Sequence, residues 1–398
     1  MNVEPFRVDV PQSVLDDLRD RLERTRFPAE FPDPDWEYGT ELGYLRAFVE
    51  YWHDAYDWRT TEARLNAFDH FTTEIDGTRV HFIHARSAEQ DALPLIITHG
   101  WPGSVIEFLD VIGPLVDPAA HGGDPADAFH VVAPSIPGYA FSGPTHDRGW
   151  HPGRVARAWA ELMAGLGYDS YVAQGGDWGS FVTTQLAHAD PEHCIGAHVN
   201  MLSPIPATDD QTEEERALLE SMTGHNNTET GYYKQQTTKP HSVGYALDDS
   251  PAGLAGWILE KFRSWSDCDG DVERCFTKDQ LIDNLMLYWL TATATSSARI
   301  YYEFDKGLAA GSLDITAKVS VPFGYARYPK ELVRTSKRWA ETWYPLAYYS
   351  EPPRGGHFAA FEVPDLFVDD LRAWRRAVKT VDRNERPSEN GVVVEPRR

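Results

Sequence analysis

The chain of 398 residues carries 37 Lys and Arg against 61 Asp and Glu, a formal net charge of -24. An acidic surface of this kind repels the phosphates of nucleic acids and of anionic lipids, so neither a nucleic acid nor a membrane is an expected partner. Hydrophobic residues make up 42% of the chain and charged residues 25%, which excludes collagen, coiled coil and wholesale disorder.

Residues 1–68 are predicted to form an arm that wraps the main domain. Apolar residues recur at helical spacing after Pro11 and Ser13, so we expect a helix over 11–25 and another over 41–58. The N-terminus does not combine a basic segment with an apolar one, which argues against a signal peptide. The apolar runs are also too short to cross a bilayer, so a soluble protein of the cytoplasm is expected.

From about residue 69 the sequence alternates between strand and helix patterns. Two β-rich runs around Asp76-Gly77 predict a hairpin. Short apolar runs typical of buried parallel strands follow it, separated by helical segments. The expected strands lie in 93–100, 129–138, 171–177 and 194–202, and the expected helices over 105–115, 152–166 and 181–190.

The alternation stops near residue 206 and resumes near residue 313. The intervening segment, 206–312, is polar and helix-prone, with helical blocks at 209–223 and 278–304. The expected elements after it are strands in 319–329 and 345–352, helices over 330–341 and 364–379, and a frayed tail from Arg383. This order predicts one α/β domain, built from 69–205 and 313–398 around a mostly parallel sheet flanked by helices, and interrupted by a helical insertion at 206–312.

The segment Gly175-Gly176-Asp177-Trp178-Gly179 directly follows a predicted strand. It has the form of the sharp strand-to-helix turn that presents a nucleophile above a parallel sheet, with Asp in the place of Ser. A carboxylate nucleophile suits displacement at a saturated carbon, as in an epoxide or an alkyl halide, and would form an ester on the enzyme. Taken alone, Asp177 could equally be an ordinary residue at a helix start.

Hydrolysis of such an ester needs N–H donors for the oxyanion. The segment His99-Gly100-Trp101-Pro102 follows an earlier strand, where this type of site places its second donor. The predicted donors are the backbone N–H groups of Trp101 and Trp178. A His-Gly pair by itself is also typical of a plain tight turn.

A general base is expected late in the chain, because this type of site orders its residues as nucleophile, acid and histidine. His357, in a Gly-Gly-His-Phe loop after a predicted strand, is the histidine that lies beyond the insertion. Its acid partner should follow the preceding strand, so Glu331 is the first candidate and Glu341 the second. A structural histidine and a solvated helix-terminal glutamate remain the alternatives.

Three motifs, HGWPGS, GGDWGS and RGGHFAAFE, together with the arm and the insertion, make the chain resemble the microsomal-type epoxide hydrolases of the α/β-hydrolase superfamily. The resemblance covers nearly the whole chain. It implies an α/β-hydrolase fold in which the insertion is a helical cap over the active site. The chain lacks the N-terminal anchor helix of the membrane-bound members, which is expected of a soluble, bacterial-type enzyme.

The resemblance also implies that two tyrosines of the cap donate hydrogen bonds to the epoxide oxygen. The residues alone do not single out two among 18 tyrosines. By motif, Tyr232 and Tyr301 occupy the matching positions, although Tyr233 and Tyr302 would replace them if the register slipped by one. The resemblance favours Glu331 as the acid.

The sequence therefore predicts an epoxide hydrolase that takes an epoxide and water to a vicinal diol without cofactor or metal. Its many aromatic residues suggest a bulky, lipophilic substrate, and a role in natural-product biosynthesis is one hypothesis. We expect a monomer or a homodimer. A haloalkane dehalogenase with the same nucleophile and a non-catalytic binding protein of the same fold are the alternatives. Two phenols in the cap favour the hydrolase, because a dehalogenase would hold its halide with ring N–H donors.

Overall fold

The computed structural model describes residues 1–29, 35–203 and 210–385. Within these residues, nine strands form one sheet in the order β1-β2-β3-β5-β4-β6-β7-β8-β9. The strands are β1 (Glu4–Phe6), β2 (His70–Ile75), β3 (Thr78–Ala85), β4 (Leu93–Thr98), β5 (Phe129–Pro134), β6 (Tyr171–Gly175), β7 (Cys194–Val199), β8 (Phe323–Ala326) and β9 (Leu346–Ser350).

The sheet is mostly parallel, as predicted. Strands β1, β2, β3 and β5 pair antiparallel, and every pair from β5 through β4, β6, β7 and β8 to β9 is parallel. The apolar residues 95–97 of the central strand β4 are fully buried, since helices cover both faces of the sheet. The parallel strands β4, β6, β8 and β9 end at one edge, so the loops that follow them gather there.

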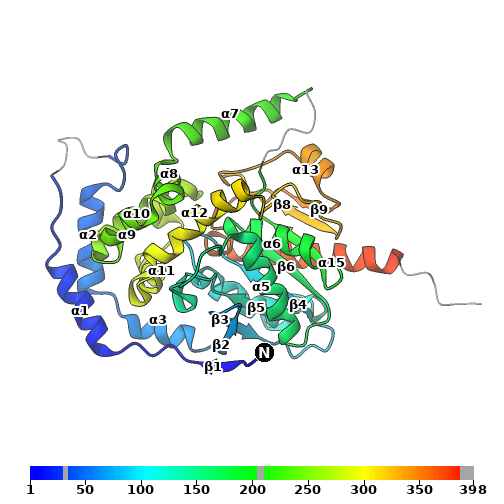
Figure 1. Cartoon of the computed structure of the whole chain (residues 1–398), viewed down its shortest axis with the longest axis horizontal. Coiled ribbons are helices and arrows are strands. Elements are labelled where there is room, and N and C mark those ends of the chain that lie inside the picture. Colours follow the sequence, from blue (N-terminus) through cyan, green and yellow to red (C-terminus); the bar gives the residue numbers. More distant parts are fainter. Residues whose placement is uncertain (30–34, 204–209, 386–398) are drawn as a thin grey trace, which may run out of the picture.

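Helices form two layers around the sheet and a cap beyond its edge (Figure 1). Helices α5 and α6 pack together in one layer, and α4 and α15 pack together in the other. The helices are α1 (Gln12–Glu23), α2 (Leu42–Asp54), α3 (Trp58–Leu65), α4 (Leu109–Val116), α5 (Pro152–Gly165), α6 (Trp178–Ala189), α7 (Glu213–Thr228), α8 (Gly231–Thr238), α9 (Pro240–Leu247), α10 (Pro251–Trp265), α11 (Lys278–Thr291), α12 (Ala294–Ala310), α13 (Lys337–Trp343), α14 (Ala359–Glu362) and α15 (Pro364–Glu385).

The cap, α7 to α12, is fastened to the core by buried hydrogen bonds. Asn284 Nδ2 donates to the carbonyl of Pro102 at 2.7 Å, and the Tyr288 hydroxyl donates to the carbonyl of Gly103 at 2.6 Å. Ser296 Oγ donates to the carbonyl of Gly138 in a second core loop. Buried hydrogen bonds of this kind are costly to break, because each partner would be left desolvated and unpaired. Helix α7 extends along the outside of the cap (Figure 1).

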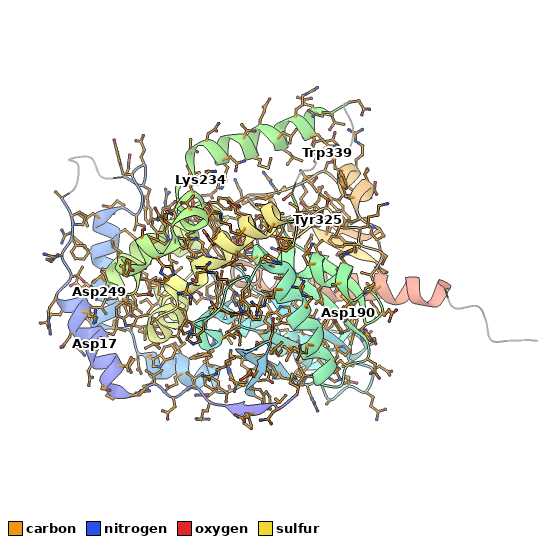
Figure 2. All side chains as sticks on the ribbon, in the orientation of Figure 1. Asp17, Asp190, Lys234, Asp249, Tyr325 and Trp339 are labelled. Atoms are coloured by element: carbon orange, nitrogen blue, oxygen red, sulfur yellow. The ribbon has the colours of Figure 1, made fainter. Side chains whose placement is uncertain are left out.

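The N-terminal arm reaches from the sheet edge to the cap. β1 adds a strand beside β2, and α1 and α2 lie beside α10 and α11 on one flank of the molecule (Figure 1). Arg21 pairs with Asp17 on its own helix and with Asp249 of the cap, at 2.8 and 3.0 Å; Figure 2 labels both carboxylates on this flank. The Tyr56 hydroxyl donates to Asp283 of α11 at 2.8 Å. The arm therefore braces the cap as well as the core.

Some predicted elements differ from the structure. The helix expected over 330–341 is wrong in its first half, because Glu331 Oε1 accepts the N–H groups of Leu332 and Val333 in a turn. Helix α13 begins only after Ser336, whose side chain caps it by accepting the N–H of Trp339. The block 278–304 is two helices, since the backbone at Ala292 turns left-handed with φ of 51°.

Strand β1 and the individual cap helices α8 to α10 are not among the predicted elements. The predicted boundary at 206 falls outside the described residues, as does the part of the predicted tail beyond Glu385. The division into 1–68, 69–205, 206–312 and 313–398 stays a prediction.

Candidate active site

Asp177 stands at a strained bend between β6 and α6. Its backbone has φ of 49° and ψ of -125°, a conformation that side chains other than glycine rarely adopt. The flanking glycines make the bend possible. A Cβ at Gly179 would lie 2.0 Å from the carbonyl oxygen of Thr98, and a Cβ at Gly175 would lie 2.1 Å from the carbonyl oxygen of Gly179. The bend lifts the Asp177 carboxylate above the edge of the sheet, as the motif predicts.

The loop after β4 approaches this carboxylate through its backbone. The Trp101 N–H donates to Asp177 Oδ1 at 2.8 Å. Gly100 must lack a side chain, because a Cβ there would lie 2.2 Å from the same oxygen. Trp178 occupies the first position of α6, where backbone N–H groups have no partner within the helix. One of the two predicted oxyanion donors thus contacts Asp177 directly, and the other is its neighbour in the chain.

His99 holds the loop after β4 and does not face the carboxylate. Its Nδ1 donates to the carbonyl of Gly100 at 3.0 Å, and its Nε2 accepts the N–H of Ile136 at 3.2 Å. Burial lowers the pKa of His99 to about 4, so the imidazole is neutral. Pro102 contributes the carbonyl that Asn284 of the cap binds. These two motif residues support the loop.

His357, Glu331 and Asp177 are brought together from three separate loops. His357 Nδ1 donates to Glu331 Oε1 at 2.8 Å, and His357 Nε2 lies 3.2 Å from Asp177 Oδ2. Both His357 and Glu331 are buried. Glu331 is oriented by the N–H of Leu332, which donates to the same oxygen at 2.7 Å. Glu341 lies elsewhere, on α13, with its side chain 53% exposed and 3.7 Å from Lys337.

The charges around His357 oppose the effect of its burial. Burial lowers its pKa, but the carboxylates of Glu331 and Asp177 raise it and prevail, so the pKa lies well above the ordinary value. His357 Nε2 and Asp177 Oδ2 are close enough for an ion pair, but they are not aligned for a hydrogen bond. His357 Nε2 therefore has no hydrogen-bond partner among the described residues. An imidazole in this position can take a proton from a group placed beside Asp177.

Tyr232 and Tyr301 lie around the Trp101 ring, in the cavity that Asp177 also lines. The Tyr232 ring stacks on Trp101 with centroids 5.3 Å apart, and the Tyr301 ring meets Trp101 edge-on at 5.8 Å. Both tyrosines line the same cavity as Asp177. Burial, and after it the nearby negative charge, raises the pKa of both phenols well above the ordinary value, so each keeps its proton.

Tyr233 and Tyr302, the sequence neighbours of these two tyrosines, make different contacts. Tyr302 is half-buried in a separate surface groove, with the Lys306 ammonium over its ring. Tyr233 lines the cavity too, but its hydroxyl donates to Asp305 at 3.3 Å. The geometry therefore favours the register with Tyr232 and Tyr301.

Two cavities meet at Asp177. One, of about 550 Å³, is lined by aromatic side chains of the core and the cap together with polar ones, and its lining includes both Asp177 and Lys234 on α8. The other, of about 20 Å³, lies on the His357 side, and polar side chains such as Gln174 and Asn200 are part of its lining. A polar cavity of that volume has room for a single water molecule.

The sequence analysis missed three polar residues of the small cavity: Glu107, Gln174 and Asn200. Burial raises the pKa of Glu107 to about 8. Gln174 Nε2 donates to Asn200 Oδ1 at 3.0 Å, while Gln174 Oε1 is buried without a protein partner in the described ranges. Glu107 could have been noticed as an acidic residue in an apolar segment, VIEFLDVIG, immediately after HGWPGS.

Two further searches concern the part of the chain that the structure describes. No group of three or more histidine, cysteine or carboxylate side chains is arranged there to hold a metal ion. None of its helices combines the length and the apolar character that a bilayer-spanning segment needs.

Comparison with known families agrees with this geometry. Residues 3–108 match the family model described as epoxide hydrolase N terminus, and residues 94–232 match the model of the alpha/beta hydrolase fold. A putative epoxide hydrolase of Stigmatella aurantiaca is 51% identical, over 95% of this chain and 86% of that protein. Epoxide hydrolase 1 of Sus scrofa is 38% identical, over 93% of this chain and 88% of that protein.

Solved structures of epoxide hydrolases are also similar to this chain. Juvenile hormone epoxide hydrolase of the silkworm Bombyx mori superposes with a TM-score of 0.88 at 32% identity, covering 96% of both chains. The epoxide hydrolase of Aspergillus niger superposes with a TM-score of 0.84 at 32% identity, covering 95% of this chain and 97% of that one.

A strained strand-to-helix bend that carries Asp177 at the carboxyl edge of a mostly parallel sheet, with a histidine and an acid on later loops, is the arrangement of an α/β-hydrolase. Within that class, the chain belongs to the epoxide hydrolase family. The predicted fold, family and hydrolase activity are thereby confirmed. The comparisons do not favour the dehalogenase or the non-catalytic alternative.

Proposed function

We propose that the chain opens its epoxide substrate through a covalent ester on Asp177, which water then hydrolyses to a vicinal diol. The observation that carries this proposal is the position of Asp177 between the two cavities. Oδ1 accepts the Trp101 N–H, and Oδ2 lies 3.2 Å from His357 Nε2. A carboxylate held in this way has one face toward a substrate cavity and the other toward a base.

In the first step, an oxygen of Asp177 attacks an epoxide carbon and forms a C–O bond, while the bond from that carbon to the epoxide oxygen breaks. The opening oxygen takes a proton from Tyr232 or Tyr301, which line the same cavity. Both phenols are protonated in the resting site, so each can donate. The volume and aromatic lining of the cavity suit a bulky, lipophilic epoxide.

In the second step, a water molecule in the small cavity gives a proton to His357 and attacks the carboxyl carbon of Asp177. The Trp101 and Trp178 N–H groups stabilise the oxyanion, and Glu331 orients the imidazole and stabilises its charged form. Collapse of the intermediate releases the diol oxygen, which takes the proton from His357. The proton on the regenerated carboxyl returns to the tyrosine pair.

The origin of the diol oxygens tests this route. One turnover in ¹⁸O-labelled water, with enzyme in excess over epoxide, should place the label in the Asp177 carboxylate and leave the diol unlabelled. Peptide mass spectrometry of the segment that contains Asp177 reads this out. Label in the diol after that first turnover would mean direct attack by water and would eliminate the ester.

Substitution of the proposed base gives an independent test. His357→Gln should still form the ester but should hydrolyse it about 10³-fold more slowly, so that the enzyme gains the mass of the substrate. Failure to observe that adduct with a competent epoxide would reassign the base.

All proposed residues belong to one chain, which suits a monomer or a homodimer with two separate sites.

A further inference from the structure

The loop that carries His357 is bound on both sides of the histidine by one carboxylate, that of Glu362. Glu362 ends α14 and is 8% exposed. Its Oε2 accepts the N–H of Gly356 at 3.0 Å, and its Oε1 accepts the N–H of Phe358 at 2.9 Å. The two backbone amides that flank His357 therefore share a single buried partner.

The same carboxylate also binds the cap. Glu362 Oε2 accepts the N–H of Asp267, just beyond α10, at 2.9 Å. Two direct bonds run alongside it: Asp267 Oδ2 accepts the N–H of Gly355 at 3.0 Å, and the carbonyl of Trp265 accepts the N–H of His357 at 2.9 Å. The backbone N–H groups of the four residues 355–358 thus donate either to a residue of the cap or to the Glu362 carboxylate, which itself binds the cap.

The packing between loop and cap leaves little freedom. A Cβ at Gly356 would lie 2.5 Å from the carbonyl oxygen of Trp265, so only glycine allows this approach. The Trp265 ring meets the His357 ring edge-on at 5.1 Å, and the Phe358 ring stacks on Phe262 of α10 at 4.2 Å. The base and the end of α10 therefore form one packed unit.

The Glu362 carboxylate is satisfied by amides rather than by a cation. The described part of the chain gives it no ion pair with Lys or Arg, and three N–H groups occupy its two oxygens. A glutamine would offer one acceptor oxygen and would point its NH₂ group at N–H donors. Glu362→Gln therefore removes at least one of the three bonds with almost no change in side-chain volume.

We propose that Glu362 is a positioning residue for the hydrolysis step, and that it keeps the His357 loop and the cap in one hydrogen-bonded unit. This inference rests on the proposed role of His357 as the base. Formation of the ester needs Asp177 and the cap tyrosines, but it does not need His357 to take a proton. Loosening the loop should therefore slow hydrolysis of the ester more than its formation.

Rapid-quench kinetics of Glu362→Gln with styrene oxide as the probe epoxide would test this. We expect ester formation to stay within about threefold of the unmodified enzyme and hydrolysis to fall about 10- to 100-fold, because misplacement of a reacting group by about 1 Å costs on that order. The ester should accumulate, and kcat should fall while kcat/KM holds. Equal loss in both steps, or unchanged hydrolysis, would overturn the proposal.

Three variants serve as controls. Glu362→Asp keeps a carboxyl group with two acceptor oxygens and should recover part of the hydrolysis rate. Asp370→Asn alters another buried carboxylate, which joins α15 to β7 and β9 by accepting from His198 and Tyr348, and should leave the ratio of the two steps unchanged. If His357→Gln itself fails to accumulate ester, the proposed function is wrong; if it accumulates ester and Glu362→Gln does not, only the present inference fails.

A second variant and a second readout guard against a folding defect. Asp267→Ala removes the acceptor for Gly355 on the cap side alone and should slow hydrolysis by roughly threefold, since one partly exposed hydrogen bond is lost. Hydrogen exchange of the amides 355–358 should be faster in both variants than in the unmodified protein. Unchanged exchange in a folded Glu362→Gln protein would contradict the proposed role.

Discussion

The two cavities that meet at Asp177 differ in size, lining and origin. The larger, of about 550 Å³, is lined by rings and closed by helices of the cap. The smaller, of about 20 Å³, is bounded by core loops and by buried polar groups such as Glu107 and Gln174. The difference in volume suggests a division of labour, in which the larger cavity receives the epoxide and the smaller one holds the water.

The division has a physical basis. Bond formation to an epoxide benefits from an apolar cavity that strengthens the few hydrogen bonds made to the opening oxygen. Attack by water needs one oriented molecule beside a base, and a cavity with room for more would hold it less precisely. Asp177 can serve both steps because its two oxygens lie between the two environments.

The largest expected effect comes from removing the group that both cavities share. Asp177→Ala should lower the rate of ester formation and of diol formation by about 10⁴-fold or more, because no other group can form the ester. Diol production by chromatography measures the rate, and intact-mass spectrometry should show no adduct. A variant with more than about a hundredth of the activity would show that the chemistry can bypass the ester.

The second prediction addresses the large cavity alone. Tyr232→Phe combined with Tyr301→Phe should slow ester formation about 10²- to 10⁴-fold, the usual contribution of a general acid, and should change hydrolysis of the formed ester far less. Tyr302→Phe is the matched control, because Tyr302 lines a different groove. Equal losses in both steps for the double variant would argue against a role in proton donation.

A third prediction addresses the small cavity. Burial raises the pKa of Glu107 to about 8, so its carboxyl is neutral at pH 7. Glu107→Gln imitates that neutral form and should change hydrolysis by less than about threefold at pH 7, whereas Glu107→Leu should slow it about tenfold through loss of one hydrogen bond to the water. Slowed ester formation in Glu107→Leu would place Glu107 on the substrate side instead.

The pH dependence of the hydrolysis step should show the smallest change. The base must be neutral, so the hydrolysis rate should rise with pH through the pKa of His357 and level off above it. Glu331 raises that pKa, and Glu331→Gln should therefore move the rising limb toward lower pH by on the order of one unit, with a lower plateau. A limb that moves to higher pH, or stays in place, would contradict the charge pairing of Glu331 with His357.

Local sequence patterns indicated much of the fold and the residues at its centre. The apolar runs that became β4, β5 and β6 are buried on both faces, and this leaves a continuous apolar signal. The glycines around Asp177 lie within five residues of one another, so their spacing is visible in the chain, although two of the contacts that require them come from Thr98 and Asn200. The helix predicted over 330–341 failed because Glu331 turns back on its own backbone to face His357, a long-range demand that helix periodicity does not record.

The sequence by itself indicated the family and the sheet of parallel strands, and it singled out Asp177 and His357 as candidates, because these inferences depend on motifs whose residues are neighbours in the chain. Only the tertiary structure decided that Tyr301, rather than Tyr302, lines the cavity at Asp177. It also decided that Glu107 lines the small cavity beside His357, and that Glu362 joins the His357 loop to the cap. These relations join segments that lie far apart in sequence, and they are fixed by how the cap seats on the core. No local sequence pattern predicts how the cap packs on the core, since that arrangement arises from the packing of the whole chain.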